Sequence, residues 1–146
     1  MIMLRRAVAA DASAIATLFR RSRAVLIFLP ELHTADEDLW FVREVLIGEQ
    51  QVTLAERDGQ LLGFMAEHEG WITQLYLDPD VRRAGVGTAL LADAKARNVE
   101  LTLWCFTANA AARAFYEKHG FVSVEATNGD RNEARLPDMR YWWKRR

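Results

Sequence analysis

The sequence predicts a single α+β domain over residues 1–146, with a mixed, mostly antiparallel sheet of about seven strands and four helices. Three observations predict this fold class. The 146 residues are enough for one domain with a closed core. Two helical segments precede three strand-like segments joined by tight turns. The second half then alternates helix and strand and ends with a pair of strands.

The first segments predict an edge strand followed by a helix. Residues 2–8 read as a short strand, and Asp11 is expected to cap a helix over residues 12–26. One face of this helix carries Ile15, Leu18 and Phe19. The helix is expected to stop at Leu29-Pro30, because proline cannot continue it.

A second helix is predicted by a capping signature. Thr34 and Glu37 have the spacing of a capping box, in which each side chain accepts a hydrogen bond from the other residue's backbone. The apolar residues that follow are Leu39, Trp40, Val42, Val45 and Leu46. Gly48 is a suitable end for this helix.

The hydrophobic period then changes from helix to strand. Residues 52–57 and 60–68 flank Asp58-Gly59, a pair that tolerates the positive φ of a two-residue hairpin turn. Glu69-Gly70 makes a second tight turn into a strand over residues 71–77. These three strands are expected to form an antiparallel meander that ends before Asp78-Pro79.

The second half of the chain predicts five further elements. In chain order they are a helix over 85–97, a strand over 100–106, a helix over 109–119, a strand over 121–126 and a strand over 139–143. Gly120 closes the second of these helices, and a polar loop with Asn128-Gly129 separates the last two strands.

Composition excludes several classes of function. Nineteen basic and twenty acidic residues give a formal charge of -1, so no basic surface for nucleic acid or an anionic membrane is expected. Cys105 is the sole cysteine and lies in an apolar run, which favours a buried filler over a nucleophile. His33, His68 and His119 lack metal-ligand spacing, so no metal site is expected. Without a leader-like or membrane-spanning apolar run, the expected location is the cytoplasm.

The segment between the meander and the next helix has the chemistry of an anion site. Arg82 and Arg83 add positive charge where Gly85 and Gly87 let the backbone approach a ligand, and a helix start offers unpaired N–H groups for phosphate. A dinucleotide-binding fingerprint requires a third glycine, but Leu90 stands there. A Walker A loop requires Gly-Lys-Ser/Thr, which is absent. Glycines that serve helix packing alone are the remaining alternative.

Two blocks together resemble the GNAT superfamily of N-acetyltransferases. Arg82-Arg83-Ala84-Gly85-Val86-Gly87 fits the family's Arg/Gln-x-x-Gly-x-Gly/Ala pyrophosphate loop in full. The segment from Asn109 to Phe121 is similar to the family's Asn-x-x-Ala-x-x-Phe-Tyr-x-x-x-Gly-Phe block. The order and spacing of the blocks agree, and the expected elements match over nearly the whole chain. The resemblance implies a GNAT-like fold.

The resemblance also implies that acetyl-CoA is the co-substrate. The positions that match the family's cofactor site are Leu75, Tyr76, Leu77, Arg82, Arg83, Ala84, Gly85, Val86, Gly87, Thr88, Asn109 and Tyr116. Asn109 and Tyr116 lie two helical turns apart, about 10 Å along the axis, so a linear pantetheine arm would run beside their shared face. Local sequence alone offers a second interpretation of both residues. It predicts Asn109 as a helix N-cap, and it predicts Tyr116 equally well as a core aromatic residue.

The implied mechanism is direct attack of an amine on the thioester within one complex. A backbone N–H at Leu75, Tyr76 or Leu77 would polarise the thioester carbonyl. Tyr116 matches the family's acid and would protonate the departing thiolate, whose thiol has a pKa near 8.5. A lysine amine is neutral in fewer than about one molecule in a thousand at pH 7, so a base or water relay is needed. Glu67, His68 and Glu69 are candidates that spacing alone does not separate.

The sequence also predicts features of the acceptor. The region between the first two helices, residues 28–33, helps to shape the acceptor pocket in the family, and Glu31 and His33 are the candidate acceptor contacts. Of Trp40 and Phe41, one is expected in the core and the other at the site. The partner is predicted to be a small-molecule or peptide amine with an apolar body, and the chain a monomer or homodimer. The rival function is a non-catalytic acyl-CoA-binding or sensor domain.

Overall fold

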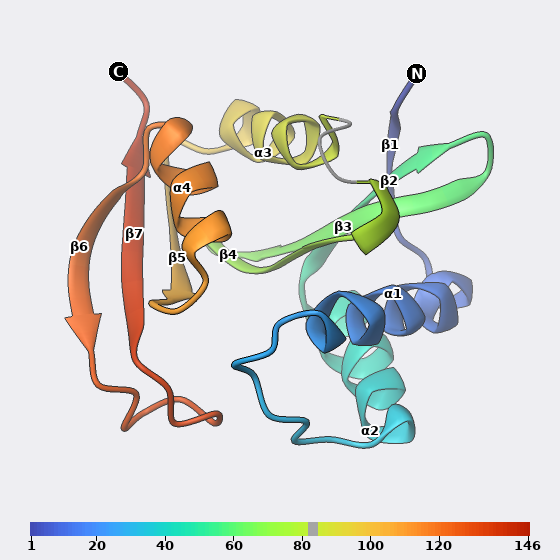
Figure 1. The fold of residues 1–146 in the computed structure, drawn as a ribbon. Helices are drawn as coiled ribbons and strands as arrows, with labels where there is room; N and C mark the ends of the chain where they lie inside the picture. The colour runs from blue at the N-terminus through green and yellow to red at the C-terminus, as the bar shows by residue number, and fades with distance from the viewer. Residues whose placement is uncertain (82–84) are drawn as a thin grey trace.

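The computed structural model describes residues 1–81 and 85–146, and these form one seven-stranded sheet with helices on both faces (Figure 1). The strands are β1 (Met3–Arg6), β2 (Gln51–Arg57), β3 (Gln60–His68), β4 (Trp71–Leu77), β5 (Glu100–Phe106), β6 (Val122–Thr127) and β7 (Asp138–Lys144). The helices are α1 (Ala12–Ala24), α2 (Ala35–Trp40), α3 (Val86–Arg97) and α4 (Ala110–Lys118). The predicted fold class is confirmed. No helix within the described residues is long and apolar enough to span a bilayer.

The sheet has the order β1-β2-β3-β4-β5-β7-β6. Every neighbouring pair is antiparallel except β4 and β5, which are parallel. Both predicted meander turns adopt positive φ at their two residues: 51° and 77° at Asp58-Gly59, and 50° and 83° at Glu69-Gly70. This geometry matches the right-handed twist of the flanking strands, which is why those dipeptides join them.

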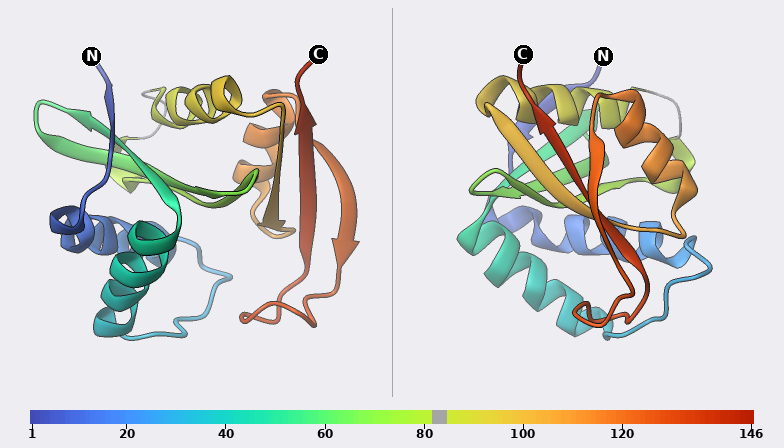
Figure 2. Two further views of the ribbon diagram at one scale, coloured as in Figure 1. Left: turned by 180° about the vertical axis from the view of Figure 1, so that it is seen from behind. Right: turned by 90° about the vertical axis from the view of Figure 1, so that its left-hand side faces the viewer.

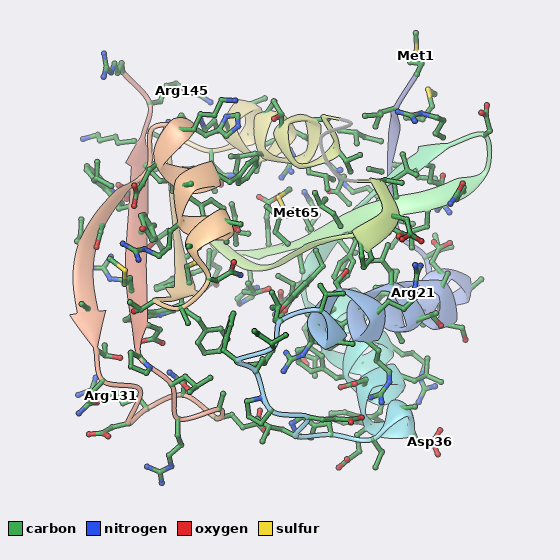
Figure 3. The ribbon with its side chains drawn as sticks, viewed as in Figure 1. Met1, Arg21, Asp36, Met65, Arg131 and Arg145 are labelled. Atoms are coloured by element: carbon green, nitrogen blue, oxygen red, sulfur yellow. The ribbon has the colours of Figure 1, made fainter. Side chains whose placement is uncertain are left out.

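Two apolar clusters lie on opposite faces of the sheet. The first packs α3 and α4 against the sheet through residues such as Met65, Leu90, Leu103 and Tyr141. In Figure 3, Met65 lies between β3 and α3. The second cluster packs α1 and the segment after α2 through residues such as Ile15, Phe19, Leu46 and Phe64. Figure 2 shows from two further sides that α1 and α2 lie on the opposite side of β2–β4 from α3.

One predicted helix cap is wrong and one is confirmed. Asp11 has helical backbone angles (φ -82°, ψ -9°), and its side chain makes no capping hydrogen bond to α1. It instead accepts from the Val8 N–H at 2.8 Å and pairs with Arg5 at 2.8 Å. The capping box before α2 is formed as predicted, with Thr34 N–H donating to Glu37 at 2.8 Å.

The second helix differs from the prediction in its hydrogen-bonding type. α2 ends at Trp40 and continues as a π-helix over Phe41–Ile47. Val42 and Leu46 of this segment are fully buried, which keeps its apolar face on the sheet. π-helical turns are rare and occur frequently at functional sites.

Candidate functional site

The site is built around a gap between β4 and β5. These parallel strands pair only at Trp71 and Thr102, where the Thr102 N–H donates to Gly70 O at 3.0 Å. In Figure 1, β3 and β4 run across the view whereas β5 and β7 run up and down, so β4 and β5 diverge beyond that pair. The divergence leaves one edge of β4 without a strand partner from Thr73 onward.

The register of β3 and β4 determines which backbone groups face this gap. The Asp78 N–H donates to Leu62 O at 2.8 Å, and antiparallel ladders alternate between bonded and non-bonded pairs. Tyr76, opposite Phe64, therefore directs its backbone toward β3. Leu75 and Leu77 direct theirs away from β3, and Leu77 O accepts from Ser22 Oγ. The amide groups of Leu75 and Leu77 are thus positioned as donors into the gap.

The side chains of the same strand divide between the two faces. Leu75 and Leu77 pack against the cluster under α3 and α4. Tyr76 packs on the opposite face, with its ring 5.1 Å from that of Phe19. The backbone groups of Leu75 and Leu77 are therefore the parts of these residues that face the gap.

The start of α3 lies at the open end of the gap. Gly85 precedes the helix with φ +80° and ψ 10°, a left-handed conformation that only glycine adopts without strain. The first-turn residues Val86 and Gly87 are buried, whereas Thr88 is exposed. First-turn N–H groups have no acceptor within their own helix and carry the positive end of its dipole. The predicted loop residues Arg82, Arg83 and Ala84 lie outside the described residues.

Tyr116, the candidate acid, lies on α4 within the core cluster that packs α3 and α4 against the sheet. Its side chain is buried, with its ring 5.6 Å from that of Phe121 and 6.1 Å from that of Tyr141. Burial raises the pKa of the Tyr116 phenol, and the nearby Cys105 and Tyr76 raise it further. The phenol therefore keeps its proton over the ordinary pH range.

Asn109 forms the N-cap of α4, as its own sequence context predicted. Its side-chain oxygen Oδ1 accepts from the Ala112 N–H at 3.2 Å. The cap fixes where α4 begins, and hence where Tyr116 is placed two turns later.

The candidate bases on the meander are not equally available. Glu67 is buried and held by Arg97 at 2.5 and 3.1 Å and by Asn98 at 3.1 Å. His68 and Glu69 are exposed at the hairpin beside Trp71. All three lie at the end where β4 and β5 are still paired.

A cavity of about 570 Å³ opens beside β4 on the α1 face. It is lined by Phe19, Arg23, His33, Asp36, Glu37, Asp38, Trp40, Phe41, Gln74 and Glu133. Trp40 is 55% exposed, whereas Phe41 packs against the core cluster. Both side chains nevertheless line the cavity.

Two connections meet at the border of this cavity. His33, from the connection between α1 and α2, contacts Glu133, from the connection between β6 and β7, at 2.5 Å. Figures 1 and 2 show these two connections approaching each other. Phe28 further ties the first connection to β5, with its ring 5.9 Å from that of Phe106.

Glu31 and His33 are placed differently. His33 lines both the 570 Å³ cavity and a neighbouring cavity of about 320 Å³, whereas Glu31 lines the smaller one and pairs with Arg20 at 2.7 Å. The sequence did not single out Arg23, Gln74 or Glu133. They come from three separate elements, and no local pattern shows that the fold brings them together.

The fold and this gap define the class of protein, and comparisons with known proteins agree. Residues 48–123 match the family model described as an acetyltransferase (GNAT) domain. The chain is 32% identical over 103 residues to the peptidyl-lysine N-acetyltransferase YiaC of Escherichia coli (strain K12), which covers 70% of this chain and 69% of that protein. It is 41% identical over 70 residues to the peptidyl-lysine N-acetyltransferase YjaB of the same strain, 48% of this chain and 47% of that protein.

Solved structures show the same fold over the full chain. The solution structure of apo-form YjaB from Escherichia coli superposes with a TM-score of 0.80 at 26% identity, covering 100% of this chain and 99% of that one. The PaiA N-acetyltransferase of Thermoplasma acidophilum, in complex with coenzyme A, has a TM-score of 0.76 at 20% identity and covers 99% of both chains. The chain belongs to the GNAT family and is an N-acetyltransferase.

Proposed function

We propose that the chain transfers the acetyl group of acetyl-CoA to a primary amine by direct attack within a ternary complex. The observation that carries this proposal is the divergence of β4 and β5, which directs the Leu75 and Leu77 amides into a gap between the α3 N-terminus and the 570 Å³ cavity. A thioester in that gap would meet the Leu75 and Leu77 N–H donors on one side and the attacking amine on the other.

The cofactor is assigned to the gap and the α3 N-terminus. The first-turn N–H groups of α3, with the loop through Arg82, Arg83 and Ala84, would hold the pyrophosphate, and the exposed Thr88 would border it. Pantetheine would pass along β4 and α4, between Leu75 and Asn109. The coenzyme A complex of the Thermoplasma acidophilum protein, which shares this fold, supports acyl-CoA as the ligand class.

The reaction needs two contributions from this chain and one from solvent. A Leu75 or Leu77 N–H would donate to the thioester oxygen as it gains negative charge. The amine nitrogen forms a bond to the carbonyl carbon, and the carbon–sulfur bond breaks. Tyr116 then gives its proton to the thiolate, water takes the proton lost by the amine, and solvent returns a proton to Tyr116. The products are free CoA and an N-acetylated amine.

The acceptor is assigned to the 570 Å³ cavity. Its aromatic wall of Phe19, Trp40 and Phe41 suits an amine with an apolar body. YiaC and YjaB are named peptidyl-lysine N-acetyltransferases, so a lysine side chain belongs among the acceptors to be tried.

The test is release of free CoA thiol when the protein and acetyl-CoA are mixed with a library of primary amines. We expect at least one amine to raise thiol release well above the amine-free rate. Tight acetyl-CoA binding with no release for any amine would instead support a non-catalytic acyl-CoA-binding domain.

A further inference from the structure

The C-terminal end of α1 carries three arginines whose partners differ. Arg20 pairs with Asp38 at 2.6 Å and Glu31 at 2.7 Å. Arg21 pairs with Asp78 at 2.8 Å and Asp80 at 2.9 Å. Arg23 forms no ion pair with any carboxylate in residues 1–81 or 85–146, and its guanidinium lies 5.0 Å from the centre of the Phe19 ring.

Arg23 also lies where the cavity meets the gap. It is partly buried and lines both the 570 Å³ cavity and the neighbouring 320 Å³ cavity. It lies beside the Tyr76 hydroxyl, and its positive charge opposes the rise that burial gives to the pKa of that phenol. Tyr76 is in turn close to Tyr116. A guanidinium with no ion-pair partner among the described residues therefore lies beside Tyr76 of β4, the strand that borders the gap.

The carboxylates of the same cavity are mostly engaged by other partners. Glu37 accepts from the Thr34 N–H at 2.8 Å, Asp38 pairs with Arg20, and Glu133 contacts His33 at 2.5 Å. Asp36 stands at the start of α2 (Figure 3). Among the described residues, Arg23 therefore has no ion-pair partner, and the four carboxylates give part of the cavity wall an acidic character.

A buried or half-buried cation is stabilised by an anion, and guanidinium groups bind carboxylates with paired hydrogen bonds. We propose that Arg23 binds a carboxylate of the acceptor, so that the acceptor is an α-amino acid whose side chain is neutral or basic. The amine and the carboxylate are on the same carbon in such a molecule. Binding of the carboxylate at Arg23 would therefore hold the amine beside the gap, and the side chain would extend along Trp40 toward the acidic wall.

This inference rests on the proposed acetyl transfer, and it narrows the acceptor. The amino-acid nitrogen bonds to the acetyl carbon as the carbon–sulfur bond breaks, giving an N-acetyl amino acid and CoA. An acidic side chain would be repelled by the cavity carboxylates, so glutamate is expected to be a poor acceptor.

The experiment compares acceptors that differ in one group, with free CoA as the readout. The panel is L-norleucine, L-norleucinamide, n-pentylamine, L-lysine, L-glutamate and a peptide with one internal lysine. We expect norleucine and lysine to exceed the amide, the pentylamine and the peptide by at least tenfold in kcat/KM. In the Arg23→Gln variant this preference should fall to about twofold or less, mainly because KM for the amino acids rises. The Arg23→Lys variant should retain part of the preference.

The matched control is Arg43→Gln. Arg43 is a half-exposed arginine that pairs with Glu44 outside the cavity, so this variant should keep the wild-type preference. Equal use of pentylamine and norleucine by the wild type, or equal loss for all acceptors in Arg23→Gln, would overturn the proposal.

A binding measurement separates failure of this inference from failure of acetyl transfer itself. In the presence of CoA, N-acetylnorleucine should raise the melting temperature of the wild type but not of Arg23→Gln, and N-acetylpentylamine should raise neither. If no amine causes CoA release but N-acetylnorleucine still raises the melting temperature of the wild type alone, then Arg23 binds the carboxylate and the proposal of acetyl transfer is wrong. If N-acetylnorleucine has no Arg23-dependent effect, the inference is wrong whatever the turnover.

Discussion

Gly87 of α3 lies directly against the ring of Phe115 of α4. A Cβ atom built at Gly87 would come within 3.1 Å of Phe115 Cζ and 3.3 Å of its Cε1, and within 3.5 Å of Leu77 Cδ1. Gly85 differs, since it has a positive φ and nothing within 4 Å of such a Cβ. The two glycines of the loop therefore serve different purposes: Gly85 permits the turn, and Gly87 permits close contact between α3, α4 and β4.

Gly87→Val should weaken CoA binding at least tenfold, about 1.4 kcal/mol. The added side chain would push the start of α3 away from Phe115 and Leu77, and overpacking of this kind costs about 1–3 kcal/mol of stability. Adding Phe115→Leu should restore part of both losses. Calorimetry measures the CoA affinity and thermal melting the stability.

Gly59→Ala is the control, because Gly59 has φ +77° in a hairpin turn with nothing near its Cβ position. It should lower stability without changing CoA affinity. Unchanged CoA affinity in folded Gly87→Val would remove this loop from the cofactor site.

Tyr116→Phe should lower kcat by about 10- to 1,000-fold with little change in acetyl-CoA affinity. The variant keeps the buried ring and removes only the proton donor. Because burial raises the pKa of this phenol, we expect no loss of wild-type activity from its ionisation as pH rises to about 10. Steady-state kinetics and calorimetry on the same preparations give the two quantities.

Tyr141→Phe is the matched comparison. The Tyr141 hydroxyl donates to Glu117 Oε2 at 2.6 Å and lies 3.4 Å from Arg113 Nε, within the α4–β7 packing. Its loss should cost about 1 kcal/mol of stability and leave kcat near the wild-type value. Full turnover in Tyr116→Phe, under conditions where chemistry limits the rate, would assign the proton to solvent or another donor.

Cys105→Ala should retain at least half of the wild-type kcat. Burial raises the pKa of the Cys105 thiol to about 11, so the thiolate needed for nucleophilic attack is scarce at pH 8. Labelling by a thiol reagent at pH 8 should be much slower in the folded protein than in urea. A folded Cys105→Ala protein that binds acetyl-CoA yet has lost turnover would favour an acyl-enzyme mechanism over direct attack.

Asp78 should make the fold sensitive to acid. Burial alone would raise the pKa of its carboxyl, but the Asp80 N–H at 2.9 Å and the Arg21 guanidinium outweigh burial, so the pKa is lower than usual. A carboxyl with a lowered pKa in the folded state stabilises the fold fully above its unfolded pKa of about 3.9 and loses that contribution as pH falls through the folded value.

The Asp78→Asn variant should therefore be less stable than the wild type at pH 7, by about 1–3 kcal/mol. Its free energy of unfolding should also fall less steeply below pH 4. Urea unfolding at a series of pH values measures both. Parallel curves for the two proteins below pH 4 would show that Asp78 does not contribute to acid sensitivity.

Local signals in the sequence predicted most of the fold. Both hairpin turns, the Thr34–Glu37 capping box, the strand at Glu100–Phe106 and the start of α4 at Asn109 are dictated by neighbouring residues, and all were confirmed. The Asp11 cap failed because the 3-10 turn before α1 already places that residue in a helical conformation.

The candidate site was predictable only in part. The backbone positions at β4 and the start of α3 follow from motifs within one segment. The cavity wall does not, because Arg23, Trp40 and Glu133 meet only after α1, the segment after Thr34 and the β6–β7 connection have packed together. That Arg23 lacks a carboxylate partner among the described residues is likewise visible only in three dimensions, since Arg20 and Arg21 look the same in sequence.

The most direct test of the account is product analysis in a single mixture of protein, acetyl-CoA and an accepted amine, with initial rates measured at varied concentrations of both substrates. We expect one free CoA for each N-acetylated amine, intersecting double-reciprocal plots, and no acetylated protein when the amine is left out. CoA released together with acetate alone, or an acetyl group on the protein with parallel plots, would contradict direct transfer in the gap between β4 and β5.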